Sequence, residues 1–282
     1  MKKIWKYYDY CHNPYMPIDS PRGRLSSDSL LYNSLLHSAC QKAFRSIIKK
    51  IRDAIGSWNT VWGVKWGCNA LTWELYFYNH RVRNPRKTAP NLLKVLRSYF
   101  HVPPFVEIDI KHQPYFMFSV DLSDDIFGFK QIDGVHLYTE GRPGISQGNS
   151  YYWGHDGMYF ENHYDFFRMP KETESFVHKV GHSLVLGKNR GSVLGHSLVR
   201  QLMPCYTICV AHKKNNDGIY FSRVNVDQLL YFLEHFSYPA HIVDFVRSRK
   251  EKLDHLLYDV AFDCALGPQG PVFSKSSYYS VF

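Results

Sequence analysis

The chain has 282 residues, 45% of them hydrophobic, which is enough to bury the core of one large domain or of two small ones. We expect one domain over residues 26–282, preceded by an arm over residues 1–25. No stretch approaches the ~18 uninterrupted apolar residues of a membrane span, and the basic N-terminus lacks an apolar run of signal-peptide length. The sequence therefore predicts a cytoplasmic protein without a membrane span.

The charge is unevenly distributed. The net charge is +9, and residues 41–100 alone hold twelve Lys or Arg against the two acids Asp53 and Glu74. A basic field of this kind favours an anionic partner. Aromatic residues make up 16% of the chain, a content typical of a protein with an aromatic-lined cavity as well as an ordinary core. The six cysteines contain no CxxC pair and are predicted to be reduced thiols.

The first predicted element is a long amphipathic helix that begins near Leu30 and is ended by Gly56. A hairpin follows over residues 61–78, because Trp, Val, Tyr and Phe dominate both arms around a turn at residues 67–69. Lys65 and Glu74 stand in the middle of its two arms. An ionised group in so apolar a strand needs solvent, a partner or a ligand, since burial alone would be costly.

The middle of the chain repeats the hairpin pattern. After a basic loop and a short helix, residues 105–122 and 127–140 predict two further hairpins, and the glycine-rich loop 141–150 leads into strands on either side of a turn at residues 155–157. The sequence gives the loop 141–150 no function. A helix is predicted next, over residues 171–185.

The last third continues in the same way. A second glycine-rich loop, over residues 186–195, precedes a hairpin turned at residues 216–218, two helices over residues 226–236 and 242–257, and two final strands. We therefore predict an α+β fold in which antiparallel β-hairpins alternate with helices. A sheet of 10–12 such strands can close into a barrel with helices outside, and a barrel of that size can hold a ligand.

Several polar side chains are predicted to face this lumen. Each lies in an apolar, aromatic-rich stretch that is predicted to be a strand, so the closed sheet would bring several of them together. The cations could bind a diphosphate, and the tyrosines could line the cavity and stabilise a carbocation. The candidates are the cations Lys65, Lys130, Arg223 and Lys275, the acid Glu74, and the tyrosines Tyr76, Tyr78, Tyr220, Tyr278 and Tyr279.

This layout resembles the aromatic prenyltransferases whose barrel is built from repeated α-β-β-α units. The resemblance covers residues 30–282 as architecture and has no linear motif. It implies an enzyme that transfers a prenyl group from an isoprenoid diphosphate to an aromatic acceptor, with Mg²⁺ as the cofactor that could accompany the diphosphate. By the same resemblance, Lys65, Arg223 and Lys275 would bind the diphosphate. Glu74 would orient the acceptor, and Tyr278 would shield the cation.

Two other functions remain open. His178 and His182 are spaced i, i+4 on a predicted helix, which would suit a metal-dependent enzyme, but the helix lacks the glutamate of an HExxH motif and we predict no metal there. The basic loop 80–87 beside Trp62, Trp66 and Trp73 could bind single-stranded nucleic acid. The preferred partner is a small anionic substrate, and we expect a monomer.

The C-terminal segment is too apolar for a mobile tail, so we predict that residues 273–282 form a docked strand. Alternation places Phe273, Lys275, Ser277 and Tyr279 on one face and Tyr278 on the other. Lys275 and Tyr278 could then line one cavity only if the strand were bulged, for which residues 276–277 are the expected place.

Overall fold

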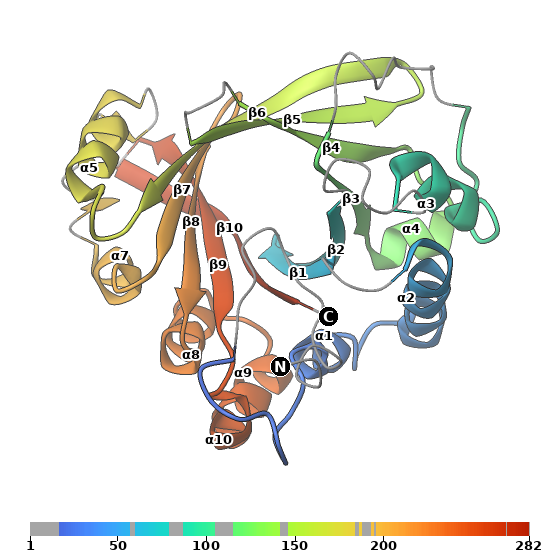
Figure 1. The fold of residues 1–282 in the computed structure, drawn as a ribbon, viewed down its shortest axis with the longest axis horizontal. Helices are drawn as coiled ribbons and strands as arrows, with labels where there is room; N and C mark the ends of the chain where they lie inside the picture. The colour runs from blue at the N-terminus through green and yellow to red at the C-terminus, as the bar shows by residue number, and fades with distance from the viewer. Residues whose placement is uncertain are drawn as a thin grey trace.

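Ten antiparallel strands close into one barrel (Figure 1). The computed structural model describes residues 17–56, 60–78, 87–104, 115–141, 146–183, 186–187, 193–194, 196–268 and 270–281. Strands β1 to β10 each pair with their neighbours in the sequence, and β10 pairs with β1 to complete the ring. The predicted α+β barrel is therefore confirmed, with ten strands.

The strand positions agree with the aromatic, alternating stretches of the sequence. The first hairpin turns at Cys68 and Asn69, which both have positive φ, at 51° and 58°, as a two-residue turn between twisted strands requires. The strands are β1 (Thr60–Gly67), β2 (Ala70–Tyr78), β3 (Met117–Leu122), β4 (Gly134–Glu140), β5 (Gln147–Gly154), β6 (Gly157–Arg168), β7 (Thr207–His212), β8 (Asp217–Val224), β9 (Tyr258–Gly267) and β10 (Gly270–Val281).

The helices lie on the outside of the barrel (Figure 1). In the described part of the chain α5 packs on the C-terminal part of β6, whereas no helix covers the outer face of β5 and of the first half of β6, where Phe160 is exposed. The helices are α1 (Asp28–Ser34), α2 (Gln41–Ile55), α3 (Ala89–Leu96), α4 (Asp124–Phe129), α5 (Thr173–His182), α7 (Ser197–Leu202), α8 (Val226–His235), α9 (Ala240–Ser248) and α10 (Lys250–Leu253).

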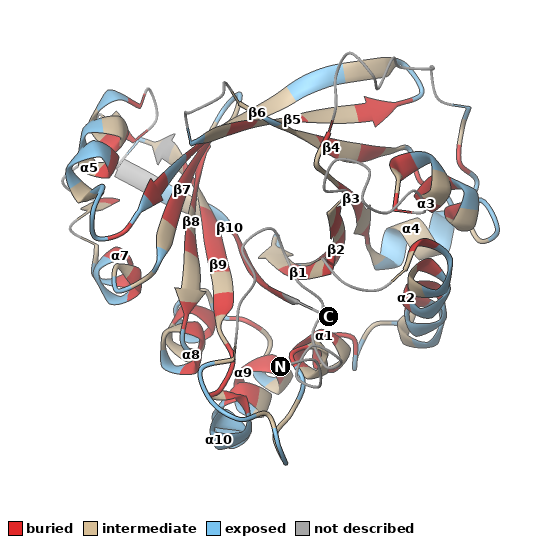
Figure 2. Cartoon of the chain, in the orientation of Figure 1, coloured by how far each residue is buried: buried red, intermediate tan, exposed pale blue. Residues whose placement is uncertain are grey.

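The apolar core fills the space between the barrel wall and these helices (Figure 2). Trp73 of β2 packs edge-on against Phe44 of α2, with 5.4 Å between ring centroids, and its indole N–H donates to Ser34 Oγ at 2.8 Å. Trp62 is also fully buried, and Trp66 donates its N–H to the Phe236 carbonyl. These three indoles belong to the core, so they do not form the exposed platform suggested for a nucleic acid. The loop 80–87 lies outside the described residues except for Lys87, which is buried.

Three predicted elements are wrong. The helix predicted over residues 242–257 is divided into α9 and α10 and ends at Leu253. The long helix from Leu30 to Gly56 is divided into α1 and α2 by residues 35–40, which turn the chain between them. Residues 127–132, predicted as a strand, instead contain the end of α4, because Ser123 caps that helix by accepting a hydrogen bond from the Ile126 N–H at 3.2 Å. The strand predicted over residues 105–110 lies outside the described part of the chain.

None of the helices in the described residues has both the length and the apolar composition needed to cross a membrane. The described end of the N-terminal arm is tied to the body by two backbone hydrogen bonds, from the Ile18 N–H to the His255 carbonyl and from the Leu25 N–H to the Lys252 carbonyl. Among the described residues, the thiols that are free are Cys40, Cys68, Cys205, Cys209 and Cys264.

A polar cluster on the outer face of β6, β7 and β8 holds α5 against the barrel. His212 Nδ1 lies 3.1 Å from Asp217 Oδ1, and His212 Nε2 lies 3.2 Å from Asp165 Oδ2. Lys179 of α5 also reaches Asp165, at 2.7 Å, and the imidazole of His163 stacks over that of His212. The contacts with Asp165 and Asp217 raise the pKa of His212 from 6.5 to about 9, against the opposing effects of burial and Lys179.

We expect this histidine to make stability depend on pH. Its folded-state pKa lies above its unfolded value, so its contribution is complete below pH 6.5 and is lost as the pH rises through 9. The free energy of unfolding should therefore fall by about 2 kcal/mol more in the wild type than in His212→Gln over this window, allowing for the partial exposure of the imidazole. Urea unfolding at pH 6 and pH 9.5 measures the difference, and parallel pH profiles for the two proteins would contradict it.

Candidate functional site

The barrel encloses a cavity of about 460 Å³, a volume typical of small-molecule sites. All ten strands contribute side chains to its wall. Eight of the predicted site residues line it, namely Lys65, Glu74, Tyr76, Tyr78, Tyr220, Arg223, Lys275 and Tyr279. The closed sheet thus brings together residues that are up to 214 positions apart in the sequence.

Five tyrosines form an arc around the middle of the lumen. Successive ring centroids lie 5.9–6.3 Å apart in the order Tyr220, Tyr279, Tyr76, Tyr138 and Tyr164. Burial raises the pKa of all five, so they stay protonated and can donate hydrogen bonds. Gly63 makes room for this arc, because a Cβ there would lie 2.6 Å from the Tyr279 ring.

Glu74 lies at the centre of this arc and is 3% exposed. Its Oε2 accepts a hydrogen bond from Tyr76 Oη and is ion-paired with Lys65 Nζ, while its Oε1 accepts from Ser119 Oγ and, at 3.3 Å, from Tyr138 Oη. The neighbours Trp73 and Leu75 face the apolar core on the other side of the sheet. Of the three ways in which the sequence allowed an ionised Glu74 to be accommodated, namely solvent, a partner or a ligand, the structure shows partners.

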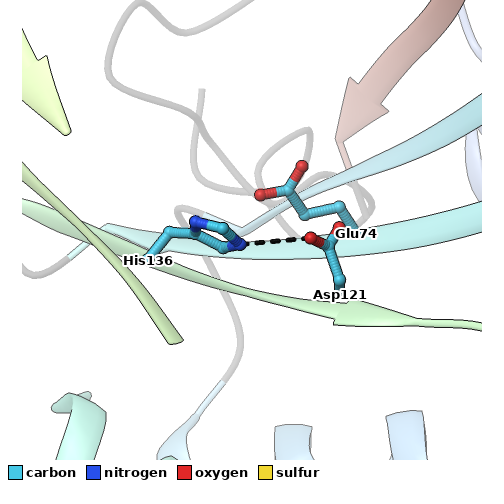
Figure 3. A group of neighbouring side chains, drawn as sticks. All are labelled: Glu74, Asp121 and His136. Atoms are coloured by element: carbon cyan, nitrogen blue, oxygen red, sulfur yellow. Dashed lines mark hydrogen bonds and ion pairs between the residues drawn. The ribbon is translucent and has the colours of Figure 1, made fainter. Parts of the chain in front are cut away.

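Glu74 is linked to four further charged side chains, and we call this group of five residues the charged network. Lys65 Nζ also contacts Asp121 Oδ1 at 2.6 Å, and His136 bridges Asp121 Oδ2 at 3.1 Å and Glu161 Oε2 at 2.8 Å. Figure 3 shows how the side chains of Glu74, Asp121 and His136 approach one another. The network contains Glu74, Lys65, Asp121, His136 and Glu161.

The charges in the network stabilise each other. Burial alone would lower the pKa of Lys65, but attraction by Asp121 and Glu74 outweighs it and raises the pKa well above its ordinary value. For His136 too, burial is outweighed by the hydrogen bonds to Asp121 and Glu161, which raise its pKa to about 10. Lys65 is therefore held as a cation. Asp121 is held as an anion, because its contacts with Lys65 and His136 keep its pKa below the ordinary range despite its burial.

Irregular pairing in three strands aims extra side chains into the cavity. Residues 160–162 of β6 face only residues 150–151 of β5, and the additional residue, Glu161, turns inward. In β8 the register shifts between Phe221 and Val224, where Arg223 has φ of 59° and also lines the cavity. The third shift, at Ser274, comes immediately before Lys275.

The cavity cations are divided between two halves. Lys275 lies opposite Gly67, the last residue of β1 before the β1–β2 turn, and opposite Asp263, which in turn lies opposite Gly218 at the start of β8. We call this half of the cavity, next to the β1–β2 turn, the turn half. Arg223 is five residues further along β8, about 16 Å away along the strand, in the far half. There its guanidinium lies 3.9 Å from the ring centroid of Tyr206.

The turn half holds two lysines in different states. Lys213 Nζ is ion-paired with Asp263 Oδ1 at 2.6 Å. Lys275 forms no salt bridge with any described residue, and its side chain is accessible to solvent. Burial among protein atoms and repulsion by Lys65 lower its pKa. Lys275 is thus the lumen cation best placed to meet an incoming anion.

Two predicted site residues lie elsewhere. Lys130 follows α4 in the left-handed conformation, exposed and away from the cavity, because its segment is helical rather than a strand. Tyr278 is fully buried on the outer face of β10, between Trp62 and Tyr238. The bulge occurs at Ser274 rather than at residues 276–277, so it moves Phe273 outward and leaves Tyr278 facing the core. Tyr279, the other tyrosine predicted in this strand, does line the cavity.

Sequence reasoning did not identify Asp121, His136 or Glu161 as lumen residues. A signal for the first two existed, since Asp121 shares strand parity with Ser119, and His136 with Tyr138, so polar groups alternate along two otherwise apolar strands. Glu161 carries no such signal, because it faces the lumen only through the bulge in β6.

The alternative metal pair lies outside the barrel, on α5. The rings of His178 and His182 stack 4.1 Å apart, and His182 Nδ1 lies 2.8 Å from the His178 carbonyl oxygen of its own helix. Within the described residues, the group of three possible ligands that comes together is Glu74, Asp121 and His136. The candidate metal ligands that the structure brings together thus lie in the lumen rather than on α5.

A comparison with models of known protein families finds no match for this chain, and a comparison with curated protein sequences finds none either. The function must therefore be argued from the cavity itself.

Proposed function

We propose that the protein is an enzyme that acts on small hydrophobic or aromatic substrates inside the barrel, and that its reaction is transfer of a prenyl group from an isoprenoid diphosphate to an aromatic acceptor. In this reaction the C–O bond to the diphosphate breaks, a bond from the prenyl carbon to the acceptor forms, and the acceptor loses a proton. The observation that carries the proposal is the arc of five lumen tyrosines around the buried carboxylate of Glu74.

Each part of the reaction has a candidate group. Tyrosine faces stabilise a carbocation through the negative potential of the ring, and a closed lumen limits its capture by water. The carboxylate of Glu74 can accept a hydrogen bond from an acceptor N–H or O–H. In the turn half, Lys275 and Lys213 can neutralise the diphosphate by charge-assisted hydrogen bonds, whereas Lys65 is engaged by two carboxylates.

The test is a transfer assay. Purified protein is incubated with dimethylallyl or geranyl diphosphate, MgCl₂ and a panel of phenols, naphthols and indoles, and products are identified by mass spectrometry. We expect a prenylated acceptor and a loss of at least about 100-fold in rate in Glu74→Gln, a loss typical of a group that stabilises the transition state. Failure of every acceptor, together with no binding of the diphosphates in calorimetry, would refute the proposal.

Lys275→Ala separates binding from folding. We expect the affinity for dimethylallyl diphosphate to fall by about 10-fold with little change in the melting temperature, because this ammonium forms no salt bridge with a described residue. Lys250→Ala is the matched control, since Lys250 is an exposed lysine paired with Asp227 on the surface. Calorimetry and thermal melts measure both quantities. Equal affinity in the wild type and Lys275→Ala would remove Lys275 from the site.

A further inference from the structure

We propose that Glu74, Asp121 and His136 form a binding site for a divalent transition-metal ion, such as Co²⁺, Mn²⁺ or Zn²⁺, and that Lys65 holds the same carboxylates when the ion is absent. The inference goes beyond the proposed function and does not rest on it. It assigns the charged network a second state, in which the metal ion takes the place of the ammonium.

The geometry is close to that of a metal site. One ligand atom from each of the three residues lies within 4.8 Å of the other two. Ligand bonds of about 2.0–2.2 Å place the donors of a bound ion roughly 3–4.4 Å apart, so small side-chain rotations would complete the shell. The residues come from the neighbouring strands β2, β3 and β4, which fix their backbones rigidly.

The candidate ligands are held by hydrogen bonds of the kind that orient ligands in known metal sites. A ligating histidine commonly donates its second ring N–H to a carboxylate, which fixes the ring and the tautomer. Glu161 stands 2.8 Å from His136 Nδ1 in that position, and Nε2 is directed at Asp121, so the ion would displace the Nε2 proton, which leaves to solvent. Ser119 and Tyr138 occupy Oε1 of Glu74, so its Oε2, now shared by Lys65 and Tyr76, is the oxygen that would bind the ion.

Lys65 acts as the competing cation. Its Nζ contacts both Glu74 and Asp121, which is where an ion held by these two carboxylates would lie. A lysine stem has four rotatable bonds, so the ammonium can withdraw when a divalent ion arrives. Removal of the ammonium should therefore strengthen metal binding, whereas in a network that served stability alone it would leave only unpaired carboxylates.

The ligand set selects the metal. One imidazole with two carboxylates suits borderline ions such as Mn²⁺, Co²⁺ and Zn²⁺. Mg²⁺ prefers oxygen ligands and keeps several waters, so it fits this set less well. Co²⁺ is the most informative probe, because its visible absorption reports the geometry of the ligands.

The experiment is a Co²⁺ titration of the full chain, followed by visible absorption, with calorimetry for Zn²⁺ and Mn²⁺. We expect one equivalent to bind and His136→Asn to weaken binding by at least about 100-fold, since loss of a ligand costs no less than loss of an outer partner. Lys65→Met should strengthen binding by at least about 10-fold. Lys213→Met, which removes another ion-paired lysine that lines the cavity, is the control and should leave the affinity unchanged. The variant His178→Ala/His182→Ala should also keep the signal.

Two results would overturn the inference. One is a signal that persists in His136→Asn but disappears in His178→Ala/His182→Ala, which would place the ion on α5. The other is the absence of binding in both the wild type and a folded Lys65→Met. If Lys65→Met does not fold, the test is the comparison of the wild type with His136→Asn. The proposal is overturned if the wild type gives no Co²⁺ spectrum, or if His136→Asn leaves that spectrum unchanged.

Discussion

Deletion of residues 273–282 is expected to abolish the cooperative unfolding transition of the protein. Strand β10 pairs with β1 on one side and with β9 on the other, so its loss opens the barrel and exposes two strand edges. It also removes Tyr278 from the core and Tyr279 from the tyrosine arc. Circular dichroism during heating and size-exclusion chromatography measure the outcome.

A point variant in the same strand supplies the comparison. Tyr278→Ala leaves both strand ladders intact but creates a cavity beside Trp62 and Tyr238, and should cost about 3–5 kcal/mol while unfolding remains cooperative. A truncated protein that melts at the temperature of the full chain would show that β10 is not needed to hold the barrel closed.

Glu74→Gln should lower the free energy of unfolding by about 2–4 kcal/mol, although the side chain keeps its size. The carboxylate is surrounded by donors, from Lys65, Tyr76, Ser119 and Tyr138. An amide offers one oxygen and an NH₂ group, so at least one buried donor loses its acceptor and faces another donor. Loss of the negative charge also leaves Lys65 with Asp121 as its remaining carboxylate contact among the described residues.

Glu234→Gln is the matched control for this change. Glu234 pairs with Arg247 on the surface, where both side chains are about half exposed, so solvent screens the pair and its loss should cost far less stability than Glu74→Gln. Urea denaturation of both variants at pH 7 tests the difference. Equal stabilities for Glu74→Gln and the wild type would mean that the four donors around Glu74 find water in its place.

Regular alternation explains how much of the site could be read from the sequence. Lys65, Glu74, Tyr76 and Tyr220 lie in strands whose inward and outward positions follow a period of two, and all four line the cavity. The same rule fails at bulges, which depend on pairing with another strand. Glu161 could not be found for that reason, and Tyr278 was wrongly included because it needed a bulge at residues 276–277, whereas the strand is bulged at Ser274.

The failure at Lys130 has a different physical cause. The stretch around it is aromatic enough for a strand, but Ser123 and the acids that follow it favour a helix start, and this local capping determined the structure. The joint position of Asp121 and His136 was also beyond local reasoning, because it depends on the register between β2, β3 and β4. Registers are set by the whole sheet.

The pairing of β1 with β10 also has a consequence for how the protein is made. Val61 lies opposite Val281, 220 residues later, and proteins with such non-local pairing fold slowly. During synthesis, Lys65 and Glu74 emerge long before the strand that closes the lumen around them. At the ~5–20 residues per second of translation, β1 therefore spends on the order of ten seconds or more with an unpaired edge, when other chains can pair with it. The β1 edge of the nascent chain is the segment that a chaperone would have to protect.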